Sequence, residues 1–212
     1  MAIQLIGGNS SAILETDATF LAARVTIRPQ QVINWQSNAA VSGALTGVAA
    51  AGAVFSFRNT GSNLILVRRV ALGFVTTTAF TTAQGLTYNL FRANGFTVSD
   101  SGGTVMYTAG ANKHRNSFTN ITSAPDIRIS AAAALTAGTR TLEGQPMGVL
   151  NGSSTAVGTS MAIQNIFSHD PEDYPLVLAQ NEGLVITNGI AMGAVGVINL
   201  QCLIEYAEVT SF

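Results

Sequence analysis

Polar and apolar residues alternate in several short segments of the chain, and this alternation predicts β-strands. In Val54–Arg58, the side chains of Phe55 and Phe57 fall on one face. Further alternating or apolar segments of strand length are Leu64–Val75, Leu86–Arg92, Asp126–Ser130, Met161–Phe167 and Leu176–Leu178. A period of two residues is typical of a strand with one buried face. These segments therefore predict a fold that is rich in sheet.

The last third of the chain carries the clearest pattern. Asn181–Gly183 predicts a turn, residues 184–187 a strand, and the glycine-spaced segment 189–196 a loop. Residues 197–209 predict a long final strand whose inward face holds Ile198, Leu200, Cys202, Ile204 and Tyr206. Because a slip of one residue would turn all of these side chains outward, we expect the register to be firm.

Helical signals are few. Ala131–Ala137 has the composition of a short helix, which Gly138 would stop. Turn residues follow the apolar segments closely, and Asn94–Gly95 is the dipeptide typical of a tight hairpin. About eight or more strands with closely spaced turns predict an all-β fold, an antiparallel β-sandwich or jelly roll.

Residues 1–50 predict an extended N-terminal arm that precedes a jelly-roll domain over residues 51–212. Ile3–Ile6 is a short apolar stretch, Ala12–Ala23 fits a short helix or extended chain, and Arg24–Arg28 alternates as a strand does. The Ala, Gly, Ser and Thr residues that follow bury little area each, so no independent core is expected here. Two interpretations stay open: a floppy leader, or an arm that lies on a partner.

Charge is scarce along the chain. Only 10% of the residues are charged, against about 25% in an ordinary soluble domain, whereas the apolar fraction of 47% is ordinary. Small and uncharged polar residues stand in place of the missing charges, so we expect a surface that packs against neighbouring molecules. The chain should therefore form a homo-oligomer, either a dimer or a trimer. The net charge of -1 leaves no field that would draw nucleic acid.

Several uncharged runs are longer than the roughly 20 residues of a membrane-spanning helix. They are Val70–Phe91, Gly144–His169 and Gly183–Ile204, with Ala39–Phe55 as a shorter run of mainly small residues. Glycine and amide residues interrupt them, so they predict pairs of strands around a turn, and no membrane role is expected.

The sequence lacks the motifs of catalytic sites. Neither His114 nor His169 belongs to a cluster with zinc spacing, and no phosphate-binding loop or Gly-x-Ser-x-Gly elbow is present. Cys202, the only cysteine, has apolar neighbours that predict a buried, inert thiol. We therefore expect a protein that is not an enzyme and needs no cofactor.

The most polar segment is residues 169–175, which contains Asp170, Glu172 and Asp173. Carboxylates this close together could bind calcium with the help of backbone carbonyls, or act as a general acid and base. Carboxylates in a proline-containing loop more often stay solvated, so these residues are weak metal candidates and a solvated loop is the preferred interpretation.

Basic residues are neighbours in the sequence at two places. Lys113–Arg115 is the only basic run and predicts a solvated loop, because three residues contribute little to binding nucleic-acid phosphate. Arg68 and Arg69 fall inside a predicted strand and should point to opposite faces. One of them would then approach the interior or an interface and pair with a carboxylate such as Glu182, Glu205 or Glu208.

Both ends of the chain carry short motifs in a recognisable order. The opening is Gly7–Ser11, then Glu15–Ala18, then the basic strand Arg24–Pro29, and the close is Ile204–Val209. This order resembles a group of tailed-bacteriophage virion proteins, whose terminal strand often carries Trp where Tyr206 stands. Asn181–Ile186 before a glycine loop also fits, whereas the middle of the chain matches only by its strand pattern.

The resemblance implies a jelly-roll capsid cement or decoration protein without catalytic residues. Its partners would be the major capsid protein and its own copies, and its place the capsid surface of the virion, after synthesis in the cytoplasm of the host bacterium. The interface candidates are Ile3, Leu5, Ile6, Arg24 and Arg28, of which the first three could add a strand to a neighbour's exposed edge. The alternative is a receptor- or glycan-binding module of a tail or fibre.

Overall fold

The computed structural model describes residues 6–7, 12–13, 34–169 and 175–210, and all regular elements in these ranges are β-strands. The longer strands are β3 (Gln36–Val41), β4 (Ala53–Arg58), β5 (Leu64–Thr78), β6 (Gln84–Asn94), β10 (Gly148–Ser154), β11 (Ser160–Ser168), β13 (Gly183–Asn188) and β14 (Val197–Val209). The short strands are β1 (Ile6–Gly7), β2 (Ala12–Ile13), β7 (Thr104–Val105), β8 (Asp126–Ile129), β9 (Thr141–Leu142) and β12 (Leu176–Leu178). Within the described ranges, no helix has the length and apolar character needed to cross a membrane.

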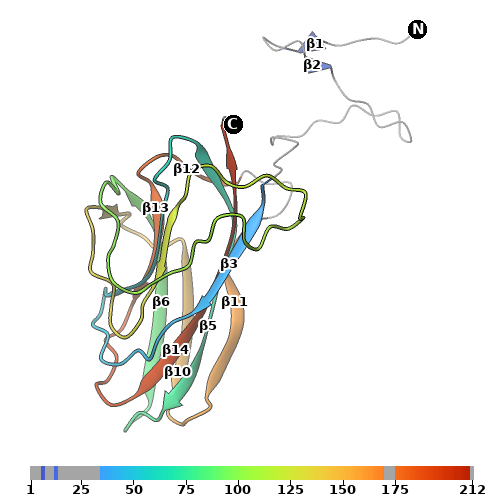
Figure 1. Cartoon of the computed structure of the whole chain (residues 1–212). Helices are drawn as coiled ribbons and strands as arrows, with labels where there is room; N and C mark the ends of the chain where they lie inside the picture. Colours follow the sequence, from blue (N-terminus) through green and yellow to red (C-terminus); the bar gives the residue numbers. More distant parts are fainter. Residues whose placement is uncertain (1–5, 8–11, 14–33, 170–174, 211–212) are drawn as a thin grey trace.

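The strands form two antiparallel sheets that pack together as a β-sandwich, which confirms the predicted fold class (Figure 1). The larger sheet has the order β10-β6-β13-β4-β8-β7, with β9 also paired to β6, and the smaller sheet has the order β11-β5-β14-β3, with β12 also paired to β5. The longer strands pair in a nested way, first with last, second with second to last, and so on inward. The connections β3–β4, β5–β6, β10–β11 and β13–β14 therefore each cross from one sheet to the other.

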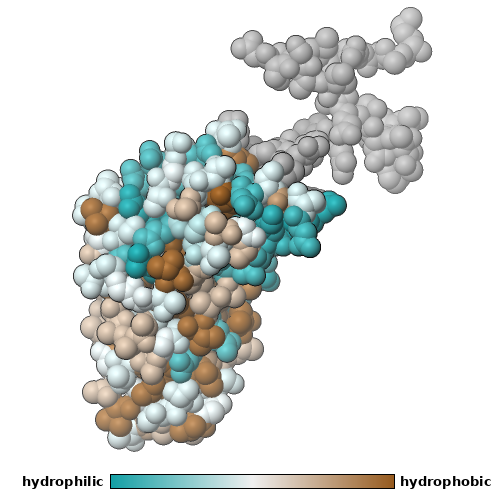
Figure 2. All heavy atoms as spheres, in the orientation of Figure 1, coloured by the Kyte–Doolittle hydropathy of each residue, from teal (hydrophilic) through white to brown (hydrophobic). Residues whose placement is uncertain are grey.

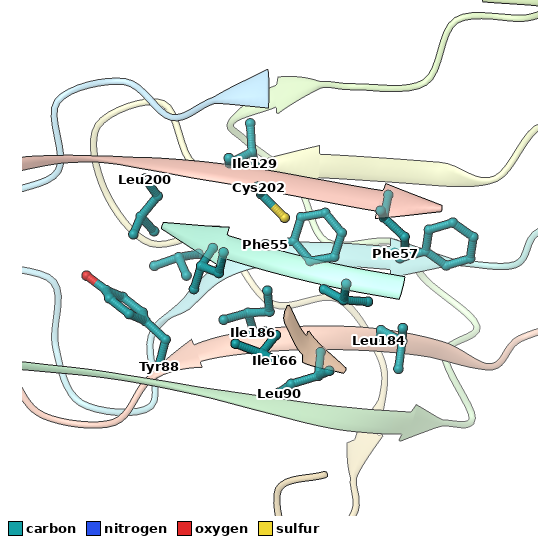
Figure 3. Close-up of a cluster of buried hydrophobic side chains, with 14 of the residues drawn as sticks. Phe55, Phe57, Tyr88, Leu90, Ile129, Ile166, Leu184, Ile186, Leu200 and Cys202 are labelled. Atoms are coloured by element: carbon teal, nitrogen blue, oxygen red, sulfur yellow. The ribbon is translucent and has the colours of Figure 1, made fainter. Parts of the chain in front are cut away.

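The core lies between the two sheets, which both contribute fully buried side chains to it (Figure 3). The larger sheet supplies Phe55, Phe57, Tyr88, Leu90, Leu184 and Ile186, and the smaller sheet supplies Leu72, Leu200, Cys202, Ile204 and Tyr206. The rings of Phe57 and Tyr206 meet edge to face with their centroids 5.1 Å apart. Aromatic pairs of this geometry add to the apolar burial that holds the sheets together.

The final strand has the predicted register. The inward residues Ile198 to Tyr206 are buried at every second position, and the residues between them are only partly covered. β14 pairs with β5 on one side and β3 on the other, so it is a central strand of the smaller sheet. Burial raises the pKa of the Cys202 thiol far above its ordinary value, which confirms that this cysteine is inert at neutral pH.

The two neighbouring arginines of β5 both face away from the core, so the prediction of opposite faces is wrong. Val67 and Arg69 pair with consecutive residues of β14, which leaves Arg68 as the extra residue of a β-bulge. The bulge shifts the alternation, so that Val67 and Val70 are both fully buried while Arg68 is exposed. The predicted ion pair does form, with Nη2 of Arg69 at 2.6 Å from Oε1 of Glu205.

Residues 131–137 do not form the predicted helix. Leu135 pairs with Ala53, and Thr136 pairs with Ser101, in single antiparallel bridges. The segment covers the outer face of the larger sheet, where Leu135 belongs to a small buried cluster with Ala53, Ala93, Phe96 and Val185. This burial outweighs the helical preference of an alanine run that is too short to be helical on its own.

Asn94 ends β6 and Gly95 forms a bend at a φ of 59°, but this is not the tight hairpin that the dipeptide predicted. β6 pairs with β10, β13 and β9, and not with the next strand along the chain. The positions beside β6 are occupied by strands that are distant in sequence, so the chain leaves the sheet after this bend.

The sandwich begins earlier in the chain than residue 51. β3 pairs with β14 from Gln36 to Val41, and Leu45 and Val48 in the following loop are buried in the core. The segment contains few large side chains, which is why its composition suggested an arm. Nearer the N-terminus, β1 and β2 pair as a two-stranded sheet in which Ile6 lies opposite Ile13.

Candidate interaction surfaces

The charge-free runs of the sequence meet at one end of the sandwich. Each run contains one of the connections that cross between the sheets, namely residues 42–52, 79–83, 155–159 and 189–196. These connections leave the sheets at the same end, which is the lower end in Figure 1. We call these four loops the uncharged end, because they contain no Asp, Glu, Lys or Arg.

Backbone hydrogen bonds join the loops of the uncharged end. The amide of Met192 donates to the carbonyl of Val48 at 2.9 Å, and the amide of Gly47 donates to the carbonyl of Gly193 at 3.3 Å. The ring of Phe80 covers Gly196 so closely that a β-carbon at that position would lie 2.1 Å from a ring carbon. Only glycine allows this approach. Three of the four loops therefore pack against one another, whereas residues 155–159 are held by β5, where the amide of Gly158 donates to the carbonyl of Thr76 at 2.9 Å.

The exposed residues of the uncharged end are all Ala, Gly, Thr, Val or Ile. The largest are Val157, Val195 and Ile190, which are 64%, 59% and 48% exposed. Figure 2 shows the same contrast, because hydrophilic residues gather over the upper part of the sandwich while the lower end is mainly white to brown. An exposed surface that carries apolar side chains and no charge is a candidate interaction site.

Charged side chains gather toward the other end, where several of them form ion pairs. Nη2 of Arg92 lies 3.0 Å from Oε1 of Glu182, and Nη2 of Arg140 lies 2.9 Å from Oδ2 of Asp100. Both pairs join segments that are distant in sequence. The sandwich thus has two ends of different character, one charged and internally paired, the other without charge.

The chain enters the sandwich at the charged end through a buried polar cluster that we call the arm root, made of Asn34, Gln36, Asn38, Tyr206 and Glu208. The side chain of Asn34 donates to the backbone carbonyl of Glu208 at 3.0 Å and accepts from its amide at 2.9 Å. Gln36 donates to the hydroxyl of Tyr206, which donates to Oδ1 of Asn38 at 2.7 Å. These bonds hold the start of the sandwich on β14.

Glu208 connects the arm root to the loop of residues 106–125. Its carboxylate accepts hydrogen bonds from the amides of Thr122 at 2.7 Å and Ser123 at 2.8 Å, and from Nδ2 of Asn63 at 3.1 Å. Burial alone would raise the pKa of Glu208, but the hydrogen bonds from Ser123 and Thr122 outweigh it and the pKa is lowered. The carboxylate is therefore ionised at neutral pH and fastens this loop.

We expect the Glu208→Gln variant to lose less stability in acid than the wild type. The folded pKa of Glu208 lies below the ordinary value of 4.5, so its contribution to stability is complete above that value and is lost as the pH falls through the folded pKa. Glutamine has no such titration. The test is the melting temperature of both proteins from pH 7 to pH 3, where the gap between them should narrow. A constant gap would contradict the role assigned to Glu208.

The basic run Lys113–Arg115 is part of the same loop, which packs on β3. Nζ of Lys113 donates to the carbonyl of Phe118 at 2.8 Å, and Nε2 of His114 lies 2.8 Å from Oγ of Ser37. The guanidinium of Arg115 lies 5.8 Å from the ring centroid of Phe118. These side chains thus contact their own loop and the neighbouring strand.

The outer edge of β3 is only partly covered by this loop. The amide of Ser37 donates across the edge to the carbonyl of Asn112 at 3.1 Å. Ala39 and Val41 direct their backbone groups to the same side, because these groups alternate along an antiparallel strand. Both residues are exposed, and their groups on this edge have no backbone partner among the described residues. Such an edge can accept an added strand.

Most residues that the sequence nominated for a site lie outside the described residues: Ile3, Leu5, Arg24, Arg28, Asp170, Glu172 and Asp173. The backbone of Ile6 belongs to β1. Within the described ranges, no group of three His, Cys, Asp or Glu side chains is placed to hold a metal ion.

The uncharged end and the arm root were not found by sequence reasoning. The signal for the uncharged end was present, because each charge-free run surrounds a predicted turn. The sequence does not show that these turns lie at the same end of the fold. The sequence contains no pattern that indicates the arm root. Its Asn, Gln and Tyr residues become a cluster only when β3 pairs with β14.

Comparison with known proteins gave no match: no family model, no curated protein and no solved structure corresponds to this chain. The function is therefore argued from the surfaces described above and from the motifs at the ends of the chain.

Proposed function

We propose that the chain is a non-enzymatic structural protein of a bacteriophage particle, a cement protein that binds the major capsid protein and its own copies. The observation that carries this proposal is the polarity of the sandwich, with an uncharged end opposite the arm root. A protein that acts by contact with two neighbours needs two surfaces, and this arrangement offers them. The nested strand pairing supports the jelly-roll part of this proposal, which the resemblance of the chain ends implies.

In this proposal the N-terminal arm makes the contact with the capsid. The hydrogen bonds of Asn34 to Glu208 fix the point at which the arm leaves the sandwich. The apolar residues Ile3, Leu5 and Ile6 would add a strand to an exposed edge of a neighbour, as the outer edge of β3 could accept one. Many copies on one particle need only modest affinity each, because their contacts act together.

The alternative of a receptor- or glycan-binding module has less support among the described residues. Sugar sites favour exposed aromatic platforms, but Trp35, the only tryptophan of the chain, is half-buried beside the arm root. Tyr88 and Tyr206 are fully buried in the core. Binding on a glycan array would favour this alternative.

Deleting residues 1–24 should abolish binding to capsids and leave the sandwich folded, because the two sheets are built from residues 36–209. The measurement is cosedimentation of the purified protein with capsids assembled from the major capsid protein. A full-length variant in which Ile3, Leu5 and Ile6 are all replaced by serine is the matched control for chain length and should also fail to bind. Unchanged cosedimentation of both variants would overturn the role of the arm.

A further inference from the structure

We propose that the uncharged end is the surface through which two copies of this chain associate. This inference deepens the part of the proposed function that concerns binding between copies, and it specifies the surface that does so. The four loops that form it are residues 42–52, 79–83, 155–159 and 189–196. Their exposed residues approach the ~20–30 residues a side that a standard interface uses.

The composition of the uncharged end suits close contact. Its exposed residues are Ala, Gly, Thr, Val and Ile, which lose little side-chain entropy when they are covered. The hydrogen bonds between the loops, such as Met192 to Val48, hold the surface in shape before a partner arrives. Association would therefore require little ordering, and the burial of Val157, Ile190 and Val195 would favour it.

The absence of charge favours a second copy over another protein. An ordinary protein surface would bring charged side chains that lose water against this end without finding a counter-charge. The same end of a second copy brings none. A two-fold contact places identical patches face to face, so a charge near the axis would meet its own copy and be repelled. The uncharged end avoids this cost entirely.

The position of the arm root agrees with this arrangement. It lies at the opposite end of the sandwich, where Asn34 and Glu208 join the start of β3 to the end of β14. Two copies that meet by their uncharged ends would leave both arm roots at the far ends of the pair. Both arms would then stay available for another partner.

The test is the oligomeric state of the full-length protein by analytical ultracentrifugation over a range of concentrations, without capsids. We expect the wild type to form a dimer and the Val157→Glu/Val195→Glu double variant to be monomeric at concentrations at which the wild type is dimeric. Val98→Glu is the matched control, because Val98 is 55% exposed but lies in a loop near the charged end. It should dimerise as the wild type does.

A threonine variant and a melting curve separate the effect of charge from loss of the fold. Val157→Thr/Val195→Thr should still dimerise, and the melting curve of the glutamate variant should remain cooperative. Mixing the double glutamate variant with Val157→Lys/Val195→Lys should restore association, since a negatively charged end then meets a positively charged one. A wild type that is monomeric throughout, or an oligomer that the two glutamates leave intact, would overturn the proposal. Because no capsid is present, neither result bears on capsid binding by the arm.

Discussion

The Asp100→Ala variant is expected to lose about 3–5 kcal/mol of unfolding free energy, because it leaves a buried guanidinium without its counter-charge. The side chain of Asp100 is fully buried, and its two oxygens accept hydrogen bonds from Nε and Nη2 of Arg140, both at 2.9 Å. It also accepts the amide of Gly138 at 2.8 Å. Since a domain is stable by only about 5–15 kcal/mol in total, this one change would bring the sandwich close to unfolding.

Urea denaturation at neutral pH would measure this loss. Glu143→Ala is the control, because the Glu143 side chain is 47% exposed and its Oε1 lies 3.9 Å from Nε of Arg92. An exposed pair of this kind contributes about 0–1 kcal/mol. A loss below about 1 kcal/mol for Asp100→Ala would mean that Arg140 finds water or another partner, and the pair would then not anchor this end of the fold.

The second large effect is expected from Phe57→Ala, which should cost about 3–5 kcal/mol. Phe57 is fully buried between the sheets, where its ring meets that of Tyr206 at an interplanar angle of 74°. Alanine would remove this contact and leave a cavity that the close-packed sheets could only partly fill. The contact that is lost joins the two sheets, because β4 belongs to the larger sheet and β14 to the smaller one.

Thermal unfolding followed by circular dichroism would test this expectation. Phe118→Ala is the matched control, since Phe118 is only partly buried in the loop of residues 106–125 and stacks on Arg115. We expect it to cost about 1 kcal/mol or less. If both variants melted at the same temperature, the packing of Phe57 between the sheets would not be a main source of stability.

The β-strands were predictable because their signal is local. Alternation in Val54–Arg58 and in residues 197–209 follows directly from the period of the strand, and the structure confirms a strand at both places. Burial alternates from Val197 to Tyr206, whereas residues 53–57 are buried on both faces of their sheet. The inert character of Cys202 could be predicted for the same reason, since its apolar neighbours at positions 200 and 204 share its face. Patterns of this kind need no knowledge of which strands become neighbours.

Features that depend on the neighbouring strand could not be predicted. Arg68 faces outward because a bulge against β14 adds one residue to β5. The local sequence contains no pattern that predicts this bulge. Residues 131–137 lie on the outer face of the larger sheet, a contact that only the folded sheet offers. The composition of β3 predicts part of an arm, because its small residues become recognisable as a strand only beside β14.

The sequence by itself determined that the protein is built of strands, that it carries few charges, and that these charges are absent from long runs around turns. Only the tertiary structure decided that these runs share one end of the sandwich and that the arm root lies at the other. The physical reason is the nested pairing of the strands, which brings distant turns to the same side. A charge-poor chain thereby becomes a sandwich with one charge-free end, on which the proposed association of two copies rests.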